Sequence, residues 1–272
     1  MILRIACVQL NAKPDLSANL DAAEHWIRAA HADGASFIAT PENTSGMYDS
    51  RAALMSAALP EAEHPAIGRF SMLARVTGAW LLVGSISILL ENGKLANRSL
   101  LFDPTGEIVA RYDKIHMFDA DPLDGQAYRE SATFQPGDKA VVAETPFGRV
   151  GLSICYDVRF ASLYAALARA GAAVITVPAA FTVPTGKAHW QVLLRARAIE
   201  TGAFIVAPGQ TGEHAGGRMT FGHSLIISPW GEVLADGGDA EGFVAADCDM
   251  ELVTKARQMI RSIDHVRPFA PA

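Results

Sequence analysis

The chain has 272 residues, half of them apolar, with a net charge of −6 and a pI near 5.7. This length and composition allow a large buried core, and the acidic balance excludes a basic stripe of the kind that binds a nucleic-acid backbone. We therefore expect a globular protein with no nucleic-acid partner.

The first half of the chain alternates strand-like runs, rich in β-branched and aromatic residues, with helix-like stretches of 3.6-residue periodicity. In chain order these are "LRIACVQL" from Leu3, a helix over 17–32, "SFIAT" from Ser36, a helix over 66–77, "AWLLVGSISILL" from Ala79, "RSLLFD" from Arg98 and "GEIVARYD" from Gly106. Ser17 is placed to cap the first helix, and Gly34 and Gly78 follow helices as C-terminal stops do.

The second half continues the alternation. Its elements are "KAVVAET" from Lys139, "RVGLSIC" from Arg149, a helix over 159–170, "AAVITVPAA" from Ala172, a helix over 188–200, "AFIVAPGQ" from Ala203, "GHSLIISPWGEVLAD" from Gly222, "GFVAADCD" from Gly242 and a helix over 250–260. Gly171 and Gly202 again mark helix ends. The sequence therefore predicts at least eleven strands.

Two segments, "PTGEIVARYD" and "PWGEVLADGG", have a Pro-x-Gly turn beside a strand and predict hairpins, with a hint of an internal two-fold. So many strands with few helices do not fit one doubly wound sheet covered on both faces. We expect a single α/β domain over residues 1–272, built as a four-layer α-β-β-α sandwich of two packed mixed sheets.

The cysteines and the N-terminal sequence indicate the cellular compartment in which the protein works. Cys7, Cys155 and Cys248 are far apart and form no CxxC pair, and the histidines form no HExxH or HxH arrangement, so neither disulfides nor a metal is predicted. "MILRIACVQLNAKPD" lacks the long apolar run and cleavage site of a signal peptide, and no stretch nears the roughly 18 apolar residues of a membrane span. We expect a cytoplasmic protein with no cofactor and no membrane partner.

Cys155 ends a strand-like run and leads into charged residues in "VGLSICYDVRF". A strand that hands over to a helix exposes its last side chain, and the helix N-terminus is expected to lower the pKa of a thiol placed there. This setting suits a nucleophile. A buried core thiol is the commoner role for a single cysteine, and it is our interpretation of Cys7 and Cys248, for which we expect no charged catalytic partners.

Three further ionisable residues follow strands or lie in loops. Glu42 occurs in "FIATPENTSG", Lys114 in "ARYDKIHMFD", and Glu130 in "YRESATFQPG" after a loop rich in Asp, Pro and Gly. Loops at strand ends usually carry the chemistry of an α/β scaffold, although each residue alone is more often a solvated surface charge.

Together these motifs resemble the nitrilase superfamily of carbon–nitrogen hydrolases over essentially the whole chain. By this resemblance, Glu42 in "TPEN", Lys114 in "YDKIHMFD" and Cys155 in "ICYDVRF" correspond to the Glu-Lys-Cys triad, and Glu130 to the second glutamate that many members carry. Cys155 would attack an amide carbonyl to form a thioester, and Glu42 would move the protons. Lys114 and the backbone N–H of Tyr156 would stabilise the oxyanion.

Glu130 is expected to orient or tune Lys114 rather than to transfer the proton. Two glutamates close together should raise each other's pKa, which would help Glu42 act as both acid and base.

The residues around the nucleophile suggest the kind of substrate. Nitrilases of the superfamily typically have Trp-Glu after the nucleophile, whereas this chain has Tyr156 and Asp157, as amidase branches do. The segments from Ala179 and Phe221 most resemble the branch that hydrolyses deaminated glutathione, and the omega-amidase branch comes next. N-carbamoyl-amine hydrolases and nitrilases of the superfamily remain alternatives.

Substrates of both amidase branches carry a carboxylate, which a guanidinium binds well. Arg159 is the candidate, with a salt bridge to Asp157 or a helix-surface charge as an alternative role. Phe181 and Thr185 are expected to shape the pocket, although a Phe there is more often core. The family usually reads Arg-Phe-Pro-Glu-Leu where this chain reads "RFASL" from Arg159, a departure that affects the helix start and the substrate rather than the triad.

The resemblance also implies a homodimer that pairs through the helices around the nucleophile, and the C-terminal "HVRPFAPA" is a candidate to reach the partner. We assign His189 and Trp190 to packing or to this dimer contact. The rival classes are a scaffold or binding protein without activity, a metal-dependent amidohydrolase and a nucleotide-binding protein. No GxGxxG follows a strand, which disfavours the last of these.

Overall fold

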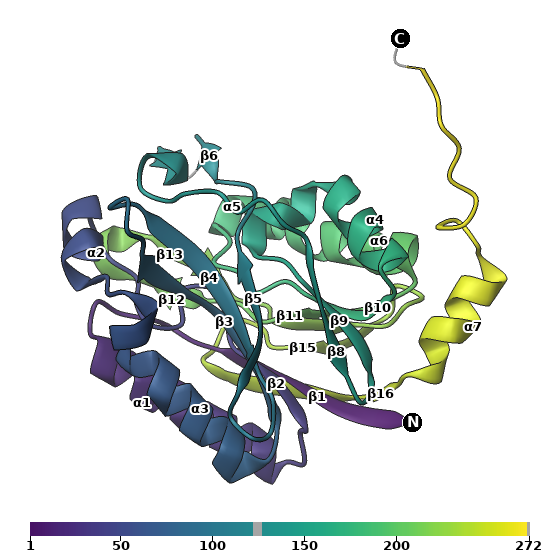
Figure 1. Cartoon of the computed structure of the whole chain (residues 1–272), viewed down its shortest axis with the longest axis horizontal. Helices are drawn as coiled ribbons and strands as arrows, with labels where there is room; N and C mark the ends of the chain where they lie inside the picture. The colour runs from purple at the N-terminus through teal and green to yellow at the C-terminus, as the bar shows by residue number, and fades with distance from the viewer. Residues whose placement is uncertain (122–126, 271–272) are drawn as a thin grey trace.

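The computed structural model describes residues 1–121 and 127–270. Two six-stranded sheets pack face to face, and helices lie on the outer face of each (Figure 1). The predicted α/β four-layer sandwich of two mixed sheets is confirmed. Each predicted strand-like run coincides with an observed strand, and the sequence missed four short strands that lie in loops.

The first sheet has the strand order β16-β1-β2-β3-β4-β5, in which β1, β2 and β3 are parallel and the other pairs are antiparallel. The strands are β1 (Ile2–Gln9), β2 (Phe37–Ala39), β3 (Trp80–Leu89), β4 (Leu95–Phe102), β5 (Ile108–Asp113) and β16 (Gly242–Asp249). β4 is antiparallel to both β3 and β5, so β5 runs in the same direction as β3 and β2. β2 and β5 therefore end at the same edge of the sheet. The predicted hairpin at Pro104 is the β4–β5 pair.

The second sheet has the order β15-β14-β11-β10-β9-β8, with β9, β10 and β11 parallel. The strands are β8 (Val141–Thr145), β9 (Gly148–Leu152), β10 (Ala172–Thr176), β11 (Phe204–Ala207), β14 (Leu225–Ile227) and β15 (Val233–Asp236). The hairpin predicted at Pro229 is the β14–β15 pair. β9 ends three residues before Cys155, where the sequence predicted a strand, because the backbone turns into a 3-10 helix there.

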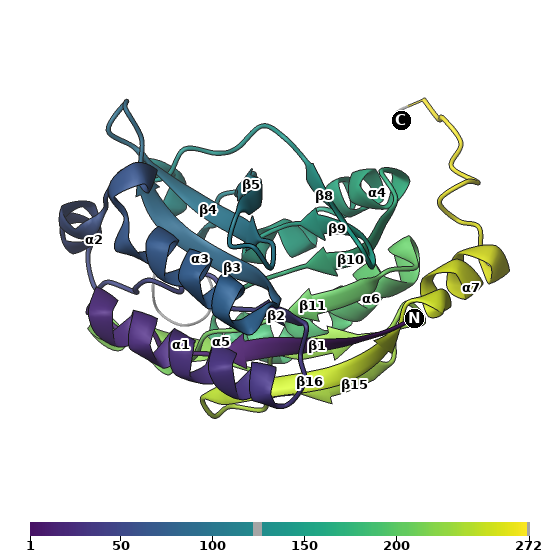
Figure 2. The ribbon, with the colours of Figure 1, turned by 60° about the horizontal axis from the view of Figure 1, so that its bottom comes forward.

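Helices α1 and α3 pack against the first sheet, and α4 and α6 pack against the second (Figure 2). The longer helices are α1 (Leu16–Ala32), α3 (Pro65–Thr77), α4 (Ala161–Arg169), α6 (Gln191–Thr201) and α7 (Glu251–Met259). The short helical pieces are α2 (Arg51–Ala57), α5 (Val183–Thr185), the 3-10 turns η1 (Glu61–Glu63), η2 (Glu130–Ala132), η3 (Cys155–Arg159) and η5 (Ala215–Gly217), and the π-helical turn η4 (Gly186–Trp190).

The starts of α1, α4 and α6 differ from the sequence prediction. α6 begins at Gln191 rather than at residue 188, because the π-helical turn η4 precedes it. The cap of α1 is Asp15 rather than Ser17, because the Asp15 side chain accepts a hydrogen bond from the backbone N–H of Ala18 at 3.1 Å. α4 begins at Ala161 because η3 occupies the preceding residues. The helix ends agree: Gly78 and Gly202 adopt left-handed conformations that terminate α3 and α6.

Strand β1 shows how the layers are held together. Leu3, Ile5 and Cys7 belong to the core that contacts the second sheet, while Ala6 and Val8 belong to the core under α1 and α3. Alternate residues of a strand point to opposite faces, so one apolar strand fills both cores. Cys7 and Cys248 are buried and unpaired, as expected of core thiols.

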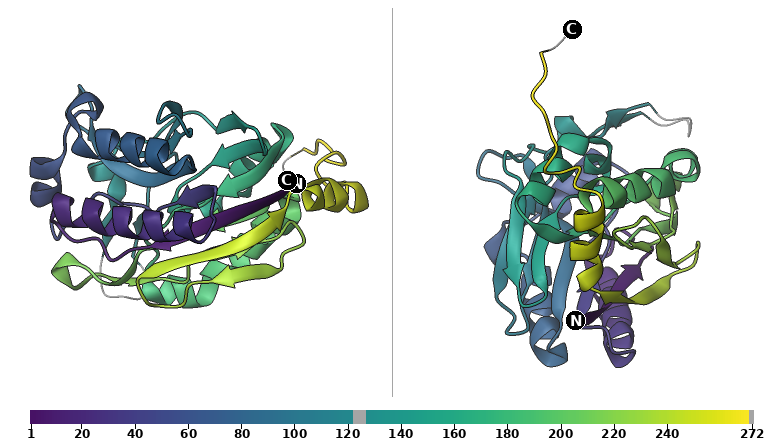
Figure 3. Two further views of the ribbon diagram at one scale, coloured as in Figure 1. Left: turned by 90° about the horizontal axis from the view of Figure 1, so that it is seen from below. Right: turned by 90° about the vertical axis from the view of Figure 1, so that its right-hand side faces the viewer.

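Helix α7 and the tail after it project beyond the two sheets (Figure 3). Phe269 in this tail is 92% exposed, and the last two residues of the proposed partner-reaching segment lie outside the described residues. Within residues 1–121 and 127–270, no helix is long and apolar enough to cross a membrane. In the same ranges, no three His, Cys, Asp or Glu side chains are grouped so that they could hold a metal ion.

Candidate active site

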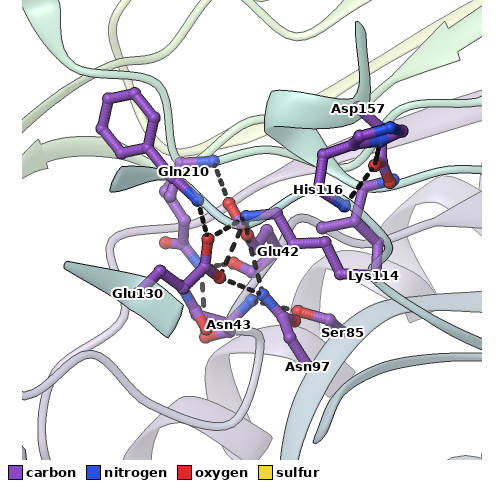
Figure 4. Close-up of polar contacts among 12 residues, drawn as sticks. Glu42, Asn43, Ser85, Asn97, Lys114, His116, Glu130, Asp157 and Gln210 are labelled. Carbon is purple, nitrogen blue, oxygen red and sulfur yellow. Dashed lines mark hydrogen bonds and ion pairs between the residues drawn. The ribbon is translucent and has the colours of Figure 1, made fainter. Parts of the chain in front are cut away.

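The four residues predicted to form the site meet in one cavity of about 400 Å³. Glu42 and Lys114 follow β2 and β5, which end at the same edge of the first sheet, and Cys155 follows β9 of the second sheet. Glu130 begins η2, after the short ribbon of β6 (Asp119–Ala120) and β7 (Tyr128–Arg129). The packing of the two sheets therefore brings together residues that are far apart in the sequence (Figure 4).

Lys114 lies at the centre of this cluster, with 2% of its side chain exposed. Its Nζ is 2.9 Å from Glu42 Oε1 and 2.9 Å from Glu130 Oε2 (Figure 4). Burial by itself would lower the pKa of Lys114, but the charges of Glu130 and Glu42 outweigh burial and raise that pKa well above its ordinary value. Lys114 is therefore a fixed cation between two carboxylates.

Glu42 is buried and is held from several sides. The backbone N–H of Ala180 donates to its Oε2 at 2.9 Å, and the Nδ2 of Asn97 donates to its Oε1 at 2.9 Å. The Cys155 thiol lies close enough for each group to shift the pKa of the other. Burial by itself would raise the pKa of Glu42, but the charge of Lys114, followed by the neighbouring Cys155 thiol, lowers it. The expected upward shift is wrong, because the cation between the two glutamates outweighs their repulsion.

Cys155 is 8% exposed and has a positive φ of 50°, so the chain turns sharply at this residue. Burial, and then the charge of Glu42, raise the pKa of its thiol well above the ordinary value, although Lys114 acts in the opposite direction. The lowered pKa expected from a helix N-terminus is wrong, because η3 is a single short turn and the sulfur is buried beside a carboxylate. Tyr156 is the second residue of η3, where a backbone N–H has no partner within the helix.

Asp157 explains why charged residues follow the buried strand. Its carboxylate is fully buried and accepts hydrogen bonds from the Tyr112 hydroxyl at 2.6 Å, the backbone N–H of His116 at 3.1 Å and the backbone N–H of Ile154 at 2.9 Å. His116 Nδ1 lies 2.6 Å from the same carboxylate (Figure 4). Tyr112 and His116 flank Lys114, so Asp157 ties the turn that carries Cys155 to the strand end that carries Lys114.

Sequence reasoning missed other residues of the cluster. Asn97 bridges the two glutamates, since its Nδ2 donates to Glu42 and also to Glu130 at 3.2 Å. Gln210 Nε2 donates to the backbone oxygen of Glu42 at 2.9 Å (Figure 4). A buried polar side chain within an apolar strand such as β4 is the signal that could have identified Asn97.

The three predicted substrate-binding residues, Arg159, Phe181 and Thr185, all line the cavity. Arg159 forms no salt bridge with Asp157, which was its alternative role. Its Nη1 lies 3.3 Å from His189 Nδ1, and its guanidinium carbon lies 5.4 Å from the centre of the Phe181 ring. The cavity side of Arg159 is therefore available to a ligand.

The aromatic wall behind the cavity is partly core, as the sequence suggested for a Phe in this place. Phe181 packs on Trp190 with ring centres 4.7 Å apart, and Trp190 Nε1 donates to the backbone oxygen of His223 at 2.8 Å. Trp190 is therefore a packing residue, as predicted, whereas His189 is exposed beside Arg159.

Comparison with known proteins identifies the family. Residues 4–258 match the sequence model of the carbon-nitrogen hydrolase family. The chain belongs to the carbon–nitrogen hydrolase family. A deaminated glutathione amidase of Synechocystis sp. is 42% identical over 265 residues, which cover 96% of each chain. The human omega-amidase NIT2 is 35% identical over 261 residues, which cover 94% of this carbon–nitrogen hydrolase and 92% of NIT2.

Solved structures agree with this membership. The NitFhit protein of C. elegans has a TM-score of 0.91 and 33% identity over 98% of this chain, which spans 65% of the NitFhit chain. Nit3 of Saccharomyces cerevisiae, a member of branch 10 of the nitrilase superfamily, has a TM-score of 0.86 and 29% identity, with 95% of this chain and 94% of Nit3 covered. The predicted nitrilase-superfamily fold and the predicted class of enzyme, a hydrolase of carbon–nitrogen bonds other than peptide bonds, are confirmed.

Proposed function

We propose that this carbon–nitrogen hydrolase converts a small carboxylate-bearing amide to an acid and ammonia, or to an acid and an amine where the amide nitrogen is substituted, through a thioester at Cys155. The observation that carries the proposal is that Cys155, Glu42 and Lys114 line one cavity, in which Lys114 Nζ donates to Glu42 Oε1 at 2.9 Å. Deaminated glutathione is the favoured substrate, because a relative named for that activity is 42% identical to this chain and one named omega-amidase is 36% identical.

In the first half-reaction, the raised pKa of Cys155 keeps the resting sulfur protonated, so a base is needed as it attacks. The Glu42 carboxylate accepts the thiol proton while the sulfur bonds to the carbonyl carbon and the carbonyl π electrons move to oxygen. When the tetrahedral intermediate collapses, Glu42 returns the proton to the leaving nitrogen. Ammonia departs from a primary amide, or an amine from a substituted one, and the acyl group remains on sulfur.

In the second half-reaction, Glu42 takes a proton from water as the water oxygen attacks the thioester carbonyl. Collapse of the second intermediate breaks the carbon–sulfur bond, and the proton passes from Glu42 to the sulfur. The acid leaves and the thiol is restored. One carboxylate therefore serves as base and acid in both halves.

Both tetrahedral intermediates carry a negative oxygen. Lys114 and the backbone N–H of Tyr156 are the proposed donors, each worth on the order of 3–4 kcal/mol in the transition state. Glu130 contacts Lys114 Nζ with both carboxylate oxygens, at 3.0 and 2.9 Å, and accepts from the backbone N–H of Phe118 at 2.6 Å. This arrangement supports a role for Glu130 in holding Lys114 rather than in moving the proton.

The substrate carboxylate is assigned to Arg159, because its planar guanidinium faces the cavity and a carboxylate can bind it with two hydrogen bonds. Phe181 would pack on the aliphatic part of the substrate. Thr185, whose hydroxyl lies 2.8 Å from that of Thr182, would border the same space.

The test is product release from a panel of compounds: cysteinylglycine from deaminated glutathione, and ammonia from alpha-ketoglutaramate, N-carbamoyl amines and simple nitriles. We expect the purified protein to turn over deaminated glutathione best, and we expect the Cys155→Ala variant to keep its circular dichroism spectrum but to release none of these products. Cys248→Ala, which alters a core thiol, is the matched control and should remain active. Equal turnover by wild type and Cys155→Ala would end the proposal, and turnover of none of the compounds would favour a scaffold.

We further propose that the chain forms a single domain and assembles as a homodimer. We also propose that it works in the cytoplasm, and that its only ligand is the small amide substrate. Val192 and Ile199 are exposed on α6, and Gly231 lies against Ile199, which places the exposed Trp230 nearby. Apolar side chains gathered in this way are typical of an interface. All three cysteines are unpaired, which is typical of a reducing compartment.

A further inference from the structure

Arg218 lies on the hairpin of β12 (Thr211–Glu213) and β13 (Met219–Phe221), a segment whose role the sequence left open. Gly216 and Gly217 both have positive φ values near 75° and form the turn that precedes Arg218. The backbone N–H of His214 donates to the backbone oxygen of Arg218 at 2.8 Å. The hairpin thus carries its arginine to the wall of the cavity that contains Cys155.

The hairpin is fastened to the body of the protein by a buried histidine. His214 Nδ1 lies 2.8 Å from the backbone oxygen of Ala12, and its Nε2 lies 2.6 Å from the Thr220 hydroxyl. Both ring nitrogens are therefore engaged, one with the loop between β1 and α1 and one within the hairpin. Arg218 is held on a fixed support, as a ligand-binding group requires.

The guanidinium of Arg218 is only partly satisfied by protein groups. Its Nη2 donates to the backbone oxygen of Ala180 at 3.1 Å, and its carbon lies 5.2 Å from the centre of the Tyr128 ring. Its Nε is buried and has no hydrogen-bond partner in the described part of the chain. Its Nη1 also forms no hydrogen bond with the described residues, so the guanidinium lines the cavity with N–H donors that a ligand can use.

Four arginines line the cavity among the described residues, and they are either exposed or half-buried. Arg129 is exposed and is paired with Asp121 at 2.9 Å, and Arg51 is exposed at the rim. Arg159 and Arg218 are half-buried, and neither forms an ion pair with a carboxylate among residues 1–121 and 127–270. Asp49 lines the same cavity but does not pair with either of them.

The two unpaired guanidiniums converge on one segment of the chain. Arg159 lies over the Phe181 ring, and Arg218 binds the backbone oxygen of the preceding residue, Ala180. The N–H of Ala180 in turn contacts Glu42. Two cations beside the nucleophile can bind two anionic groups of a single ligand. A ligand with only one carboxylate would leave one of the two guanidiniums without an anionic partner.

We propose that Arg218 binds a second carboxylate of the substrate, so that the preferred substrate is an amide carrying two carboxylates, one on Arg159 and one on Arg218. This inference rests on the proposed amidase function. It adds a binding residue and narrows the substrate class to dianionic amides. A cavity of about 400 Å³ has room for such a molecule.

Two compounds that differ in one carboxylate test the proposal. N-acetylglutamine and N-succinylglutamine share the carboxamide and the α-carboxylate, and only the second has a distal carboxylate. We expect wild type to have a lower KM for N-succinylglutamine. The Arg218→Gln variant should raise that KM by roughly 10- to 100-fold, because a charge-assisted hydrogen-bonded pair is lost, and should leave the KM for N-acetylglutamine unchanged.

Three variants separate binding from a structural role. Arg218→Lys keeps the charge but not the planar fork, so it should recover part of the affinity. Arg159→Gln should weaken both compounds, and Arg129→Gln, which changes a paired arginine of the same cavity, should affect neither. If Arg218 only supported Ala180 and Glu42, Arg218→Gln would instead lower kcat for both compounds to the same extent, and the proposal would be wrong.

A binding measurement tests the role of Arg218 independently of turnover. Calorimetry with the Cys155→Ala protein should show roughly 10- to 100-fold tighter binding of N-succinylglutamine than of N-acetylglutamine, and Arg218→Gln in that background should abolish the difference. Equal affinities for the two compounds, or no binding of either, would overturn the role of Arg218. Absence of ammonia release alongside a retained binding difference would instead reject the amidase function and keep the anion site.

Discussion

At the scale of single residues, the proton between Cys155 and Glu42 is the feature on which the proposed chemistry depends. The pKa of the carboxyl is lowered and that of the thiol is raised, so the resting pair is a carboxylate and a neutral thiol. Glu42 and Lys114 act on the sulfur in opposite directions. Removing one of the two charges should therefore shift the pKa of the Cys155 thiol in a predictable direction.

The Glu42→Gln variant keeps the shape of the side chain and removes its charge. We expect ammonia release to fall by roughly 10²- to 10⁴-fold because the general base is lost. The pKa of Cys155 should nevertheless fall, because Lys114 then acts on the sulfur without an opposing carboxylate. A pH titration of thiolate ultraviolet absorbance, with the Cys155→Ala signal subtracted, measures this pKa.

The same titration can contradict the proton assignment. A Cys155 thiol that ionises at the same or a higher pH in Glu42→Gln than in wild type would mean that Glu42 does not hold the thiol in its protonated form. Loss of activity would then have to be explained by changed geometry rather than by loss of the base.

At the scale of elements, the β12–β13 hairpin depends on a histidine that folds in its neutral form. Burial lowers the pKa of His214 to about 4, from an ordinary value near 6.5. The unfolded chain therefore takes up this proton at a higher pH than the folded chain does. Stability must fall as pH falls from about 6.5 to about 4, and this loss is complete below that range.

The His214→Asn variant removes this titration. We expect the variant to be less stable than wild type at neutral pH, because two hydrogen bonds are disturbed. The difference in free energy of unfolding between the two proteins should narrow by up to about 3 kcal/mol as the pH falls from 6.5 to 4. Urea unfolding at several pH values measures the difference. A gap that stays constant with pH would show that His214 is not held neutral by burial.

At the scale of the whole molecule, the two sheets share one continuous core. Leu3, Ile5 and Phe37 of the first sheet belong to the same buried cluster as Val150 and Ile205 of the second. Neither sheet can keep that face buried without the other. The chain should therefore unfold as a unit, which is the content of the single-domain proposal.

Urea unfolding followed by far-ultraviolet circular dichroism and by tryptophan fluorescence tests the domain and the dimer together. Trp80 lies in the first sheet and Trp190 under the second, so fluorescence reports on both. We expect coincident single transitions whose midpoint rises with protein concentration, as a dimer requires. Two separated transitions would contradict the single domain, and a midpoint independent of concentration would contradict the dimer.

Much of the fold was predictable from local patterns. Strand β1 and helix α1 were recognised because apolar residues recur at spacings of two and of three to four, and Gly78 and Gly202 marked helix ends by their conformational freedom. Short pieces such as η3 were not predicted. Their conformation depends on contacts with distant parts of the chain, as in the hydrogen bond from the Cys155 N–H to Pro178.

The sequence by itself determined which residue types are present for the chemistry and that each follows a strand, because both depend only on neighbours along the chain. Only the tertiary structure decided their electrostatics. Glu42 lies 72 positions from Lys114 in the sequence, and the charge of Lys114 lowers the pKa of Glu42, which was expected to rise. Burial and the charge of Glu42 raise the pKa of Cys155, which was expected to fall. Folding also brings Arg218 from a segment with no recognisable pattern to the cavity wall, because burial and charge act through space rather than along the chain.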